Sequence, residues 1–153
     1  MGWIALLDEL RPFFDLGMGL LIWLVQLIVY PSFAYSSPES FKSWHFRYTG
    51  LITIFVLPLM FGQTGIYLAS AWLAGRWHDW SGVVLVAACW AATFLLSVPC
   101  HDGLQKNGFD LAVVQRLVRT NWIRTIAWST ICVIDIAVGL VAPEALSLLA
   151  RQS

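Results

Sequence analysis

Charged residues are scarce in this sequence, and the few that are present cancel. They make up 12% of the 153 residues, against about 25% in an ordinary soluble domain. Nine Lys and Arg balance nine Asp and Glu, so the chain has no basic excess with which to bind a nucleic acid. Hydrophobic residues reach 59% and the mean hydropathy is +0.73, which is too apolar for a protein dissolved in water.

Several motifs of soluble enzymes are also absent. The sequence contains no GxGxxG, no P-loop and no HExxH motif, so no nucleotide loop or peptidase zinc site is predicted. Its three cysteines, Cys89, Cys100 and Cys132, form no CxxC pair and lie in or at the end of apolar runs. We interpret them as small buried side chains rather than as a thiol-disulfide centre.

Four long apolar runs dominate what is present, at about residues 13–30, 50–73, 81–99 and 125–142. About 20 apolar residues cross a bilayer as a helix, and no run alternates as a membrane strand would. Trp and Tyr cluster at the ends of the runs, as in interfacial aromatic belts. We therefore predict a single transmembrane domain over residues 1–153, all-α, with four transmembrane helices in an antiparallel bundle.

Two start signals predict helix outside these runs. Ser37-Pro38-Glu39 combines a capping Ser, Pro at the first helical position and an acid in the first turn, so the second helix should begin near Pro38. Asp110 can cap a further helix, in which apolar residues gather on one side. That pattern predicts a short interfacial helix before helix four.

The basic residues favour one orientation. The termini and the 74–80 loop carry Arg11, Arg76 and Arg151. The opposite side carries more, with Arg124 at its boundary: Lys42, Arg47, Lys106, Arg116 and Arg119. The positive-inside rule then predicts that loops 31–49 and 100–120 are cytoplasmic.

Polar side chains on apolar helices are costly and tend to face the bundle interior or a cavity. At 100° per residue, the fourth helix gathers several within about 40° of one line, with Arg124 at its edge: Asn121, Thr125, Trp128, Cys132 and Asp135. On the second helix, His45 and Gln63 are five full turns apart, Tyr48 continues the line, and Trp44 flanks it.

These residues predict a polar cavity that opens on the side of the two larger loops and narrows toward Gln63 and Asp135. His45 or His101 would take a proton from an acidic C–H or a phenol, while Arg124 and Asn121 hold the developing oxyanion. The predicted catalytic residues are thus His45, His101 and Arg124. The predicted ligand-binding residues are Trp44, Tyr48, Gln63, Asn121, Trp128 and Asp135.

Two stretches carry a resemblance to known proteins. The first holds Val29-Tyr30-Pro31-Ser32-Phe33, Trp44-His45 and Pro58-Leu59-Met60 with Gln63. The second holds Val98-Pro99-Cys100-His101-Asp102-Gly103 and Arg119-Thr120-Asn121-Trp122-Ile123-Arg124-Thr125. Over about residues 20–135 the chain resembles a group of uncharacterised bacterial four-helix membrane proteins, itself distantly similar to the anthrone-oxygenase-like membrane family.

That resemblance implies a bacterial inner-membrane protein whose site includes His45, Gln63, His101, Asn121 and Arg124. The better-known oxygenases act on polyketide anthrones without metal or flavin, so it implies cofactor-free chemistry. Asp135 is not part of the recognised motif, and its role follows from the helix-face argument alone.

Four other interpretations stay open. Small-residue faces and nine Trp suit an accessory or structural subunit of a larger membrane complex. His45 and His101 would suit a haem or a metal ion if their rings faced each other with room between them. Asp15 and Asp135 would suit a proton path. The same polar residues would also serve only to cap helix ends and bind lipid phosphates. The sequence names no cofactor and no metal site, and the expected partners are membrane lipids, a hydrophobic small molecule or other membrane subunits.

Overall fold

Helices account for almost all of the described chain. The computed structural model describes the backbone of residues 2–150 and the side chains of residues 2–140. Within that part there is no strand. Four helical stretches are long and apolar enough to cross a membrane: Trp3–Tyr35, Pro38–Leu73, Trp77–Asn107 and Leu111–Leu140. The predicted all-α protein with four candidate membrane-spanning helices is therefore confirmed.

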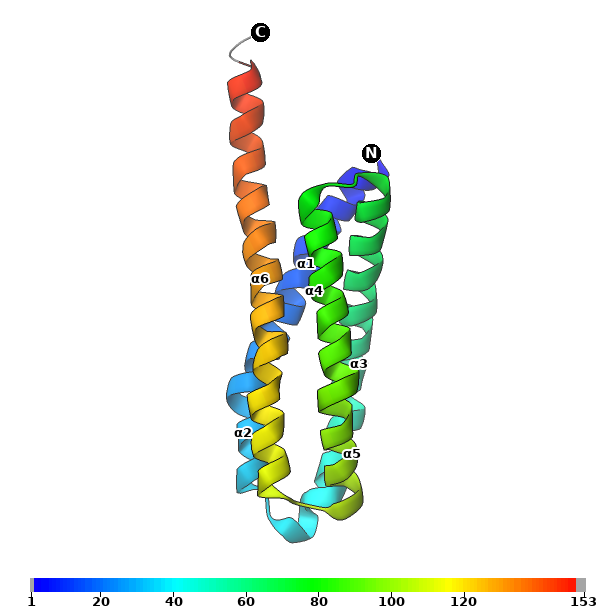
Figure 1. Cartoon of the computed structure of the whole chain (residues 1–153), viewed down its shortest axis with the longest axis vertical. Coiled ribbons are helices and arrows are strands. Elements are labelled where there is room, and N and C mark those ends of the chain that lie inside the picture. The colour runs from blue at the N-terminus through cyan, green and yellow to red at the C-terminus, as the bar shows by residue number, and fades with distance from the viewer. Residues whose placement is uncertain (1, 151–153) are drawn as a thin grey trace.

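Each helical stretch packs against two others (Figure 1). Helix α1 (Trp3–Leu24) contacts α3 (Pro38–Leu73) and α6 (Leu111–Ala150), and α4 (Trp77–Ala92) contacts the same two helices. The start of α1 and the end of α6 lie at one end of the molecule, together with the turn between α3 and α4. We call this the terminal end. The opposite end, where residues 36–37 and 108–110 connect the helices, is the loop end.

The first and third stretches are each interrupted by one turn of π-helix. In the first, α1 passes into η1 (Val25–Val29), then α2 (Tyr30–Ser32) and η2 (Phe33–Tyr35). In the third, α4 passes into η3 (Thr93–Ser97) and then α5 (Val98–Asn107). Single π-turns are rare in α-helices, and those that occur often lie at functional sites. These two turns therefore indicate where in the bundle a functional site would lie.

The predicted helix starts agree with the structure, and they leave little loop. Helix α3 begins at Pro38 as predicted, but the Ser37 hydroxyl bonds the Ser40 hydroxyl at 2.7 Å and caps no backbone N–H. The Asp110 carboxylate accepts hydrogen bonds from the backbone N–H of Ala112 at 2.8 Å and of Val113 at 3.3 Å. Residues 111–120, predicted as a separate interfacial helix, therefore form the first turns of α6. Most of the segments 31–49 and 100–120, predicted as loops, are helical too.

The surface between the two ends is apolar. Leu20, Phe55 and Val133 are each more than 60% exposed, although they lie well inside their helices. The buried core is centred on aromatic and aliphatic side chains such as Phe33, Phe41 and Leu117. An apolar exterior around a fully helical backbone suits a lipid environment, where every backbone polar group must be bonded internally.

Gly82 on α4 allows a close approach of α3. A Cβ atom at Gly82 would lie 2.0 Å from Cε1 of Tyr67, a buried ring that is fixed by its hydrogen bond to Asp15. We expect Gly82→Ala to lower the free energy of unfolding by about 1–3 kcal/mol, the usual cost of overpacking, in SDS titrations of the protein in bicelles. Gly65→Ala is the control, because nothing lies within 4 Å of a Cβ there. Equal losses in the two variants would contradict the close approach.

Candidate functional site

A cavity of about 300 Å³ lies between the helices in the half of the bundle nearer the loop end. All four helical stretches contribute to its lining, and both π-turns border it through Val25, Thr93 and Ser97. The part of the cavity nearer the terminal end is apolar, lined by Met18, Leu21, Ile22, Val56 and Trp128. Its wall toward the loop end is polar, lined by Tyr30, His45, Tyr48, His101, Gln105 and Arg124.

The cavity reaches the outer surface of the bundle between α3 and α5. Thr53 on α3 and Val98 and Asp102 on α5 line it, and all three side chains are exposed. This opening faces sideways from the helices rather than along the bundle. A molecule dissolved in the surrounding apolar phase would therefore meet the opening directly.

Four side chains of the polar wall form a continuous line of hydrogen bonds. The Tyr30 hydroxyl lies 3.1 Å from Nε2 of His101, and Nδ1 of His101 lies 2.9 Å from Nε2 of His45. Nδ1 of His45 in turn lies 3.0 Å from Oε1 of Gln105. The line joins the first, second and third helical stretches, and it leaves no nitrogen of the two imidazoles without a partner.

Arg124 adds a buried positive charge to this wall. Its guanidinium donates to the Tyr30 hydroxyl at 3.1 Å and to the Thr93 hydroxyl at 3.3 Å, and also to the side-chain oxygen of Asn121. The side chain is only 7% exposed. Among the described side chains no carboxylate lies within ion-pair distance of it, and its Nε has no hydrogen-bond partner. Burying an unpaired charge costs free energy. The position of Arg124 therefore destabilises the fold unless a bound group interacts with the charge.

Aromatic packing fixes the two imidazoles. The Phe33 ring, fully buried, lies 5.8 Å from the His45 ring and 6.3 Å from the His101 ring. Phe41 stacks on His45 at 5.3 Å with an interplanar angle of 21°. Edge and stacked contacts of this kind hold rings in defined orientations. The histidines are therefore held by packing as well as by hydrogen bonds.

A second group of polar side chains lies between the cavity and the terminal end. Asp15 is buried and accepts hydrogen bonds from Nε2 of Gln63 at 2.6 Å and from the Tyr67 hydroxyl at 2.7 Å. The indole of Trp128 donates to Oε1 of Gln63 at 2.9 Å. Trp128 separates Gln63 from the cavity, so this group supports the cavity floor and does not line it.

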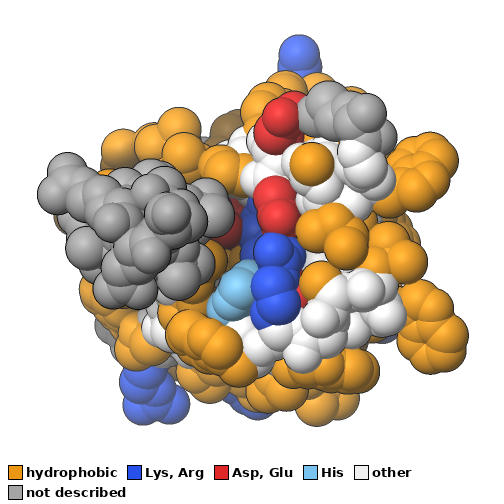
Figure 2. Space-filling view, turned by 90° about the horizontal axis from the view of Figure 1, so that it is seen from above, with side chains coloured by type: hydrophobic (Ala, Val, Ile, Leu, Met, Phe, Trp, Pro, Cys, Tyr) orange, Lys and Arg blue, Asp and Glu red, His pale blue; other side chains and the backbone are white. Residues whose placement is uncertain are grey.

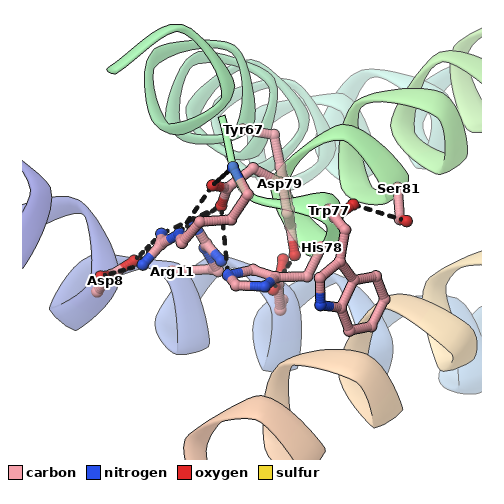
Figure 3. Close-up of polar contacts among 9 residues, drawn as sticks. Asp8, Arg11, Tyr67, Trp77, His78, Asp79 and Ser81 are labelled. Atoms are coloured by element: carbon pink, nitrogen blue, oxygen red, sulfur yellow. Dashed lines mark hydrogen bonds and ion pairs between the residues drawn. The ribbon is translucent and has the colours of Figure 1, made fainter. Parts of the chain in front are cut away.

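The terminal end holds an ionic cluster, which Figure 2 shows as charged side chains in the middle of an otherwise mostly hydrophobic face. Arg11 donates to Asp79 at 2.6 Å, and Arg76 bonds both Asp8 at 2.7 Å and Asp79 at 2.9 Å (Figure 3). His78 lies 3.6 Å from Asp79. The hydrogen bonds that Arg76 donates, first to Asp8 and then to Asp79, raise the pKa of Arg76 above its ordinary value. Two cations and two anions balance here, and the cluster joins α1 to α4.

The structure brings most of the predicted site residues together. His45, His101, Arg124, Tyr48 and Trp128 line the cavity. Asn121 and Gln63 lie one contact behind it, bonded to Arg124 and Trp128 respectively.

Two predicted residues do not reach the cavity. Trp44 stacks on Tyr48 from outside, with ring centroids 5.6 Å apart. Asp135 is half-buried on α6 and does not line the cavity, and Gln63 bonds Asp15 where the sequence predicted proximity to Asp135.

Sequence reasoning missed several residues of the polar wall. In the sequence, Tyr30 is one of the aromatic residues at the ends of the apolar runs, and no site role is predicted for Thr93 or Gln105. Gln26 supports the wall from behind, because its Oε1 accepts a hydrogen bond from Asn121 at 2.8 Å. Tyr30-Pro31 and the segment around His101 do belong to the stretches that carry the resemblance, and this was the available signal.

The site does not suit a metal between the two histidines. Their facing nitrogens are 2.9 Å apart, whereas two metal–nitrogen bonds of about 2.0 Å each separate such nitrogens by about 4 Å when they lie in line. The ring centroids are only 5.2 Å apart, which also leaves no space for a haem plane between the two imidazoles. Within residues 2–140 no group of three or more His, Cys, Asp or Glu is placed to hold a metal ion. Comparisons of the chain with protein-family models, curated proteins and solved structures give no match.

Proposed function

We propose that this chain is an integral membrane protein whose cavity binds a small, largely apolar molecule through an oxygen atom. The observation that carries the proposal is Arg124, a buried cation without a carboxylate partner at the wall of an apolar chamber. Buried ionisable groups within a membrane protein are by default functional. An electron-rich oxygen of a ligand would give this guanidinium the partner that the described side chains do not supply.

The volume and lining of the cavity support the same class of ligand. About 300 Å³ is at the lower end of the range for small-molecule sites, which are mostly apolar with a few convergent polar groups. Met18, Ile22 and Val56 would contact a hydrocarbon or ring portion. Tyr48 lines the cavity, and its hydroxyl bonds no described residue, so it offers a further contact.

The chemistry we propose is that of a cofactor-free, oxygenase-like enzyme. The histidine pair would accept a proton from an acidic C–H or O–H group of the ligand, and Arg124 would stabilise the resulting oxyanion. Asn121 would act through Arg124, because it bonds the guanidinium and does not line the cavity. What favours this reaction class is the resemblance of the sequence to a bacterial membrane-protein group that is itself distantly similar to the anthrone-oxygenase-like family.

We expect the purified protein to retain a small apolar molecule from the membrane, and Val56→Trp to lower that retention strongly. Val56 lines the cavity, and an indole there would fill the volume that the ligand needs. Mass spectrometry of organic extracts should show a drop of about tenfold, equivalent to 1.4 kcal/mol of binding free energy.

Leu57→Trp is the matched control, because Leu57 is the next residue, is 40% exposed and does not line the cavity. It should retain as much ligand as the unchanged protein. Extracts that contain only bulk lipid in all three proteins would count against the proposed function.

An accessory subunit of a membrane complex is the second candidate, and Asp135 is the observation that favours it. Its carboxylate bonds no described residue, while Val133 and Ile136 beside it are exposed. A helix of another subunit would be a natural partner. Recovery of a stable complex larger than the single chain from native membranes in mild detergent would favour this role.

We further propose an antiparallel arrangement in a bacterial inner membrane, with the loop end in the cytoplasm. The ion pairs of Arg11 and Arg76 with Asp8 and Asp79 neutralise the basic residues described at the terminal end. Arg151 lies outside the described residues. Lys42, Arg47 and Lys106 at the loop end are in no ion pair with a described residue, and the first turns of α6 would lie at that surface.

A further inference from the structure

We infer that Tyr30, His101 and His45 form a proton path that takes a proton from a ring hydroxyl of the bound molecule and holds it on His45. The inference rests on the proposed function, since it needs a ligand in the cavity. It adds a residue, Tyr30, a direction of transfer and a ligand class, a phenol or enol. The two ends of the hydrogen-bonded line are chemically fixed, and they determine the direction of transfer.

At one end of the line, the side chain of Gln105 can only accept a hydrogen bond from His45. Nε2 of Gln105 lies 3.4 Å from the backbone carbonyl oxygen of Lys42, and a carbonyl oxygen has no hydrogen to give. The amide nitrogen must therefore face Lys42, which turns the amide oxygen toward His45. Nδ1 of His45 lies 3.0 Å from that oxygen and so carries the hydrogen.

At the other end, Arg124 can only donate a hydrogen bond to Tyr30. Nη2 of Arg124 lies 3.1 Å from the Tyr30 oxygen, and a guanidinium has no acceptor atom. The Tyr30 oxygen therefore accepts this bond, and its own hydrogen is free to point at Nε2 of His101, 3.1 Å away.

The two fixed ends assign every hydrogen between them. Tyr30 donates to Nε2 of His101, Nδ1–H of His101 donates to Nε2 of His45, and Nδ1–H of His45 donates to Gln105. Both imidazoles are neutral in this state, with the hydrogen on Nδ1. The reverse direction would place two acceptors face to face, the unprotonated Nδ1 of His45 and the amide oxygen of Gln105.

Proton transfer along this line balances as follows. The O–H bond of the ligand breaks and its proton joins the Tyr30 oxygen, while the Tyr30 O–H bond breaks and its proton joins Nε2 of His101. The Nδ1–H bond of His101 then breaks, and that proton joins Nε2 of His45. Tyr30 and His101 end neutral, the ligand becomes an oxyanion, and His45 becomes an imidazolium.

The surroundings stabilise both charges. Arg124 and the new Tyr30 hydroxyl face the oxyanion, and the amide oxygen of Gln105 remains bonded to Nδ1 of the His45 imidazolium. His45 is 1% exposed, so the proton is kept from solvent and is available for return. Asp102 is the carboxylate of the cavity lining, and it lies at the exposed rim.

The test uses the full chain in nanodiscs with 4-nitrophenol, whose phenolate absorbs at longer wavelength than its phenol. Equilibrium dialysis measures binding, and the absorption spectrum reports the protonation state at a pH at which the free probe is mostly phenol. We expect the bound probe to show the phenolate band. Nitrogen-15 NMR of labelled histidine should show neutral, Nδ1-protonated His45 and His101 without probe, and one imidazolium with it.

Three variants separate the proton path from binding alone. His45→Gln should bind the probe and lose the phenolate band, Tyr30→Phe should lose it too, and His78→Gln at the terminal end should keep it. A probe that binds the unchanged protein as phenol, with both histidines still neutral, would overturn the path and leave the binding function standing. No binding in dialysis would overturn both. If His45→Gln does not fold, the NMR result on the unchanged protein decides.

Discussion

Asp79→Leu should lower the free energy of unfolding by about 3–5 kcal/mol, the usual cost of removing one partner of a buried ion pair. Asp79 is fully buried and receives hydrogen bonds from both Arg11 and Arg76. Its loss leaves Arg11, which is 3% exposed, with a single 3.4 Å ion pair among the described residues, to Asp8. SDS titration in bicelles, followed by circular dichroism, measures the effect.

Asp8→Asn is the matched control for the same cluster. The Asp8 side chain is 39% exposed, and exposed ion pairs contribute about 0–1 kcal/mol, so this variant should be nearly neutral. The double variant Arg11→Met with Asp79→Leu should recover much of the loss, because no unpaired charge remains buried. Equal effects of Asp79→Leu and Asp8→Asn would show that the cluster does not join α1 to α4 as described.

Phe33→Ala should lower the free energy of unfolding by on the order of 3 kcal/mol, the lower end of the range for Phe→Ala in a packed core. Phe33 is fully buried and its ring contacts the rings of Phe41, Tyr48, His45 and His101. Its removal would also free the histidine pair to rotate. The same SDS titration gives the stability, and NMR of the two histidines gives their order.

Phe46→Ala controls for the chemistry of the substitution. Phe46 is next to His45 in sequence, but it is 70% exposed on the outer surface of α3, so its truncation leaves no cavity in the bundle. It should change stability little and leave the histidine signals unchanged. If both Phe variants behave alike, aromatic packing does not position the imidazoles.

The fold could be predicted from the sequence because hydropathy and length alone determine which segments can cross a bilayer. Helix starts were also predictable, since Pro38 and Asp110 act through residues next to them in the chain. The extent of helix between the spans was underestimated. A helix that caps well and packs on its neighbours continues past the membrane boundary, and hydropathy does not detect this.

Half of the site could be predicted from helix faces. Asn121, Thr125 and Trp128 lie on one face of α6, and all three are buried in the bundle. The same line placed Asp135 with them, but α6 stands apart from the other helices toward the terminal end (Figure 1), so Asp135 meets no described hydrogen-bond partner. The helical periodicity predicts which side of a helix a residue lies on. Whether the residue meets a partner there depends on the position of the neighbouring helix.

The pairing between helices could not be predicted from single-helix patterns. Whether Gln63 meets Asp15 or Asp135 depends on how α1, α3 and α6 are shifted along one another. The two π-turns, which border the cavity, have no sequence signature of their own. Tyr30 likewise reads as an interfacial aromatic until its contacts with Arg124 and His101 are known.

A crystal structure of the protein grown from a lipid phase with 4-nitrophenol would test the central claim most directly. The claim is that Arg124 is a buried cation that binds an oxygen atom of a ligand. We expect the probe between Val56 and Tyr30, with its oxygen within hydrogen-bond distance of Tyr30 or the guanidinium. An Arg124 turned outward to lipid headgroups, with aliphatic side chains filling the space between Met18 and Val56, would contradict it.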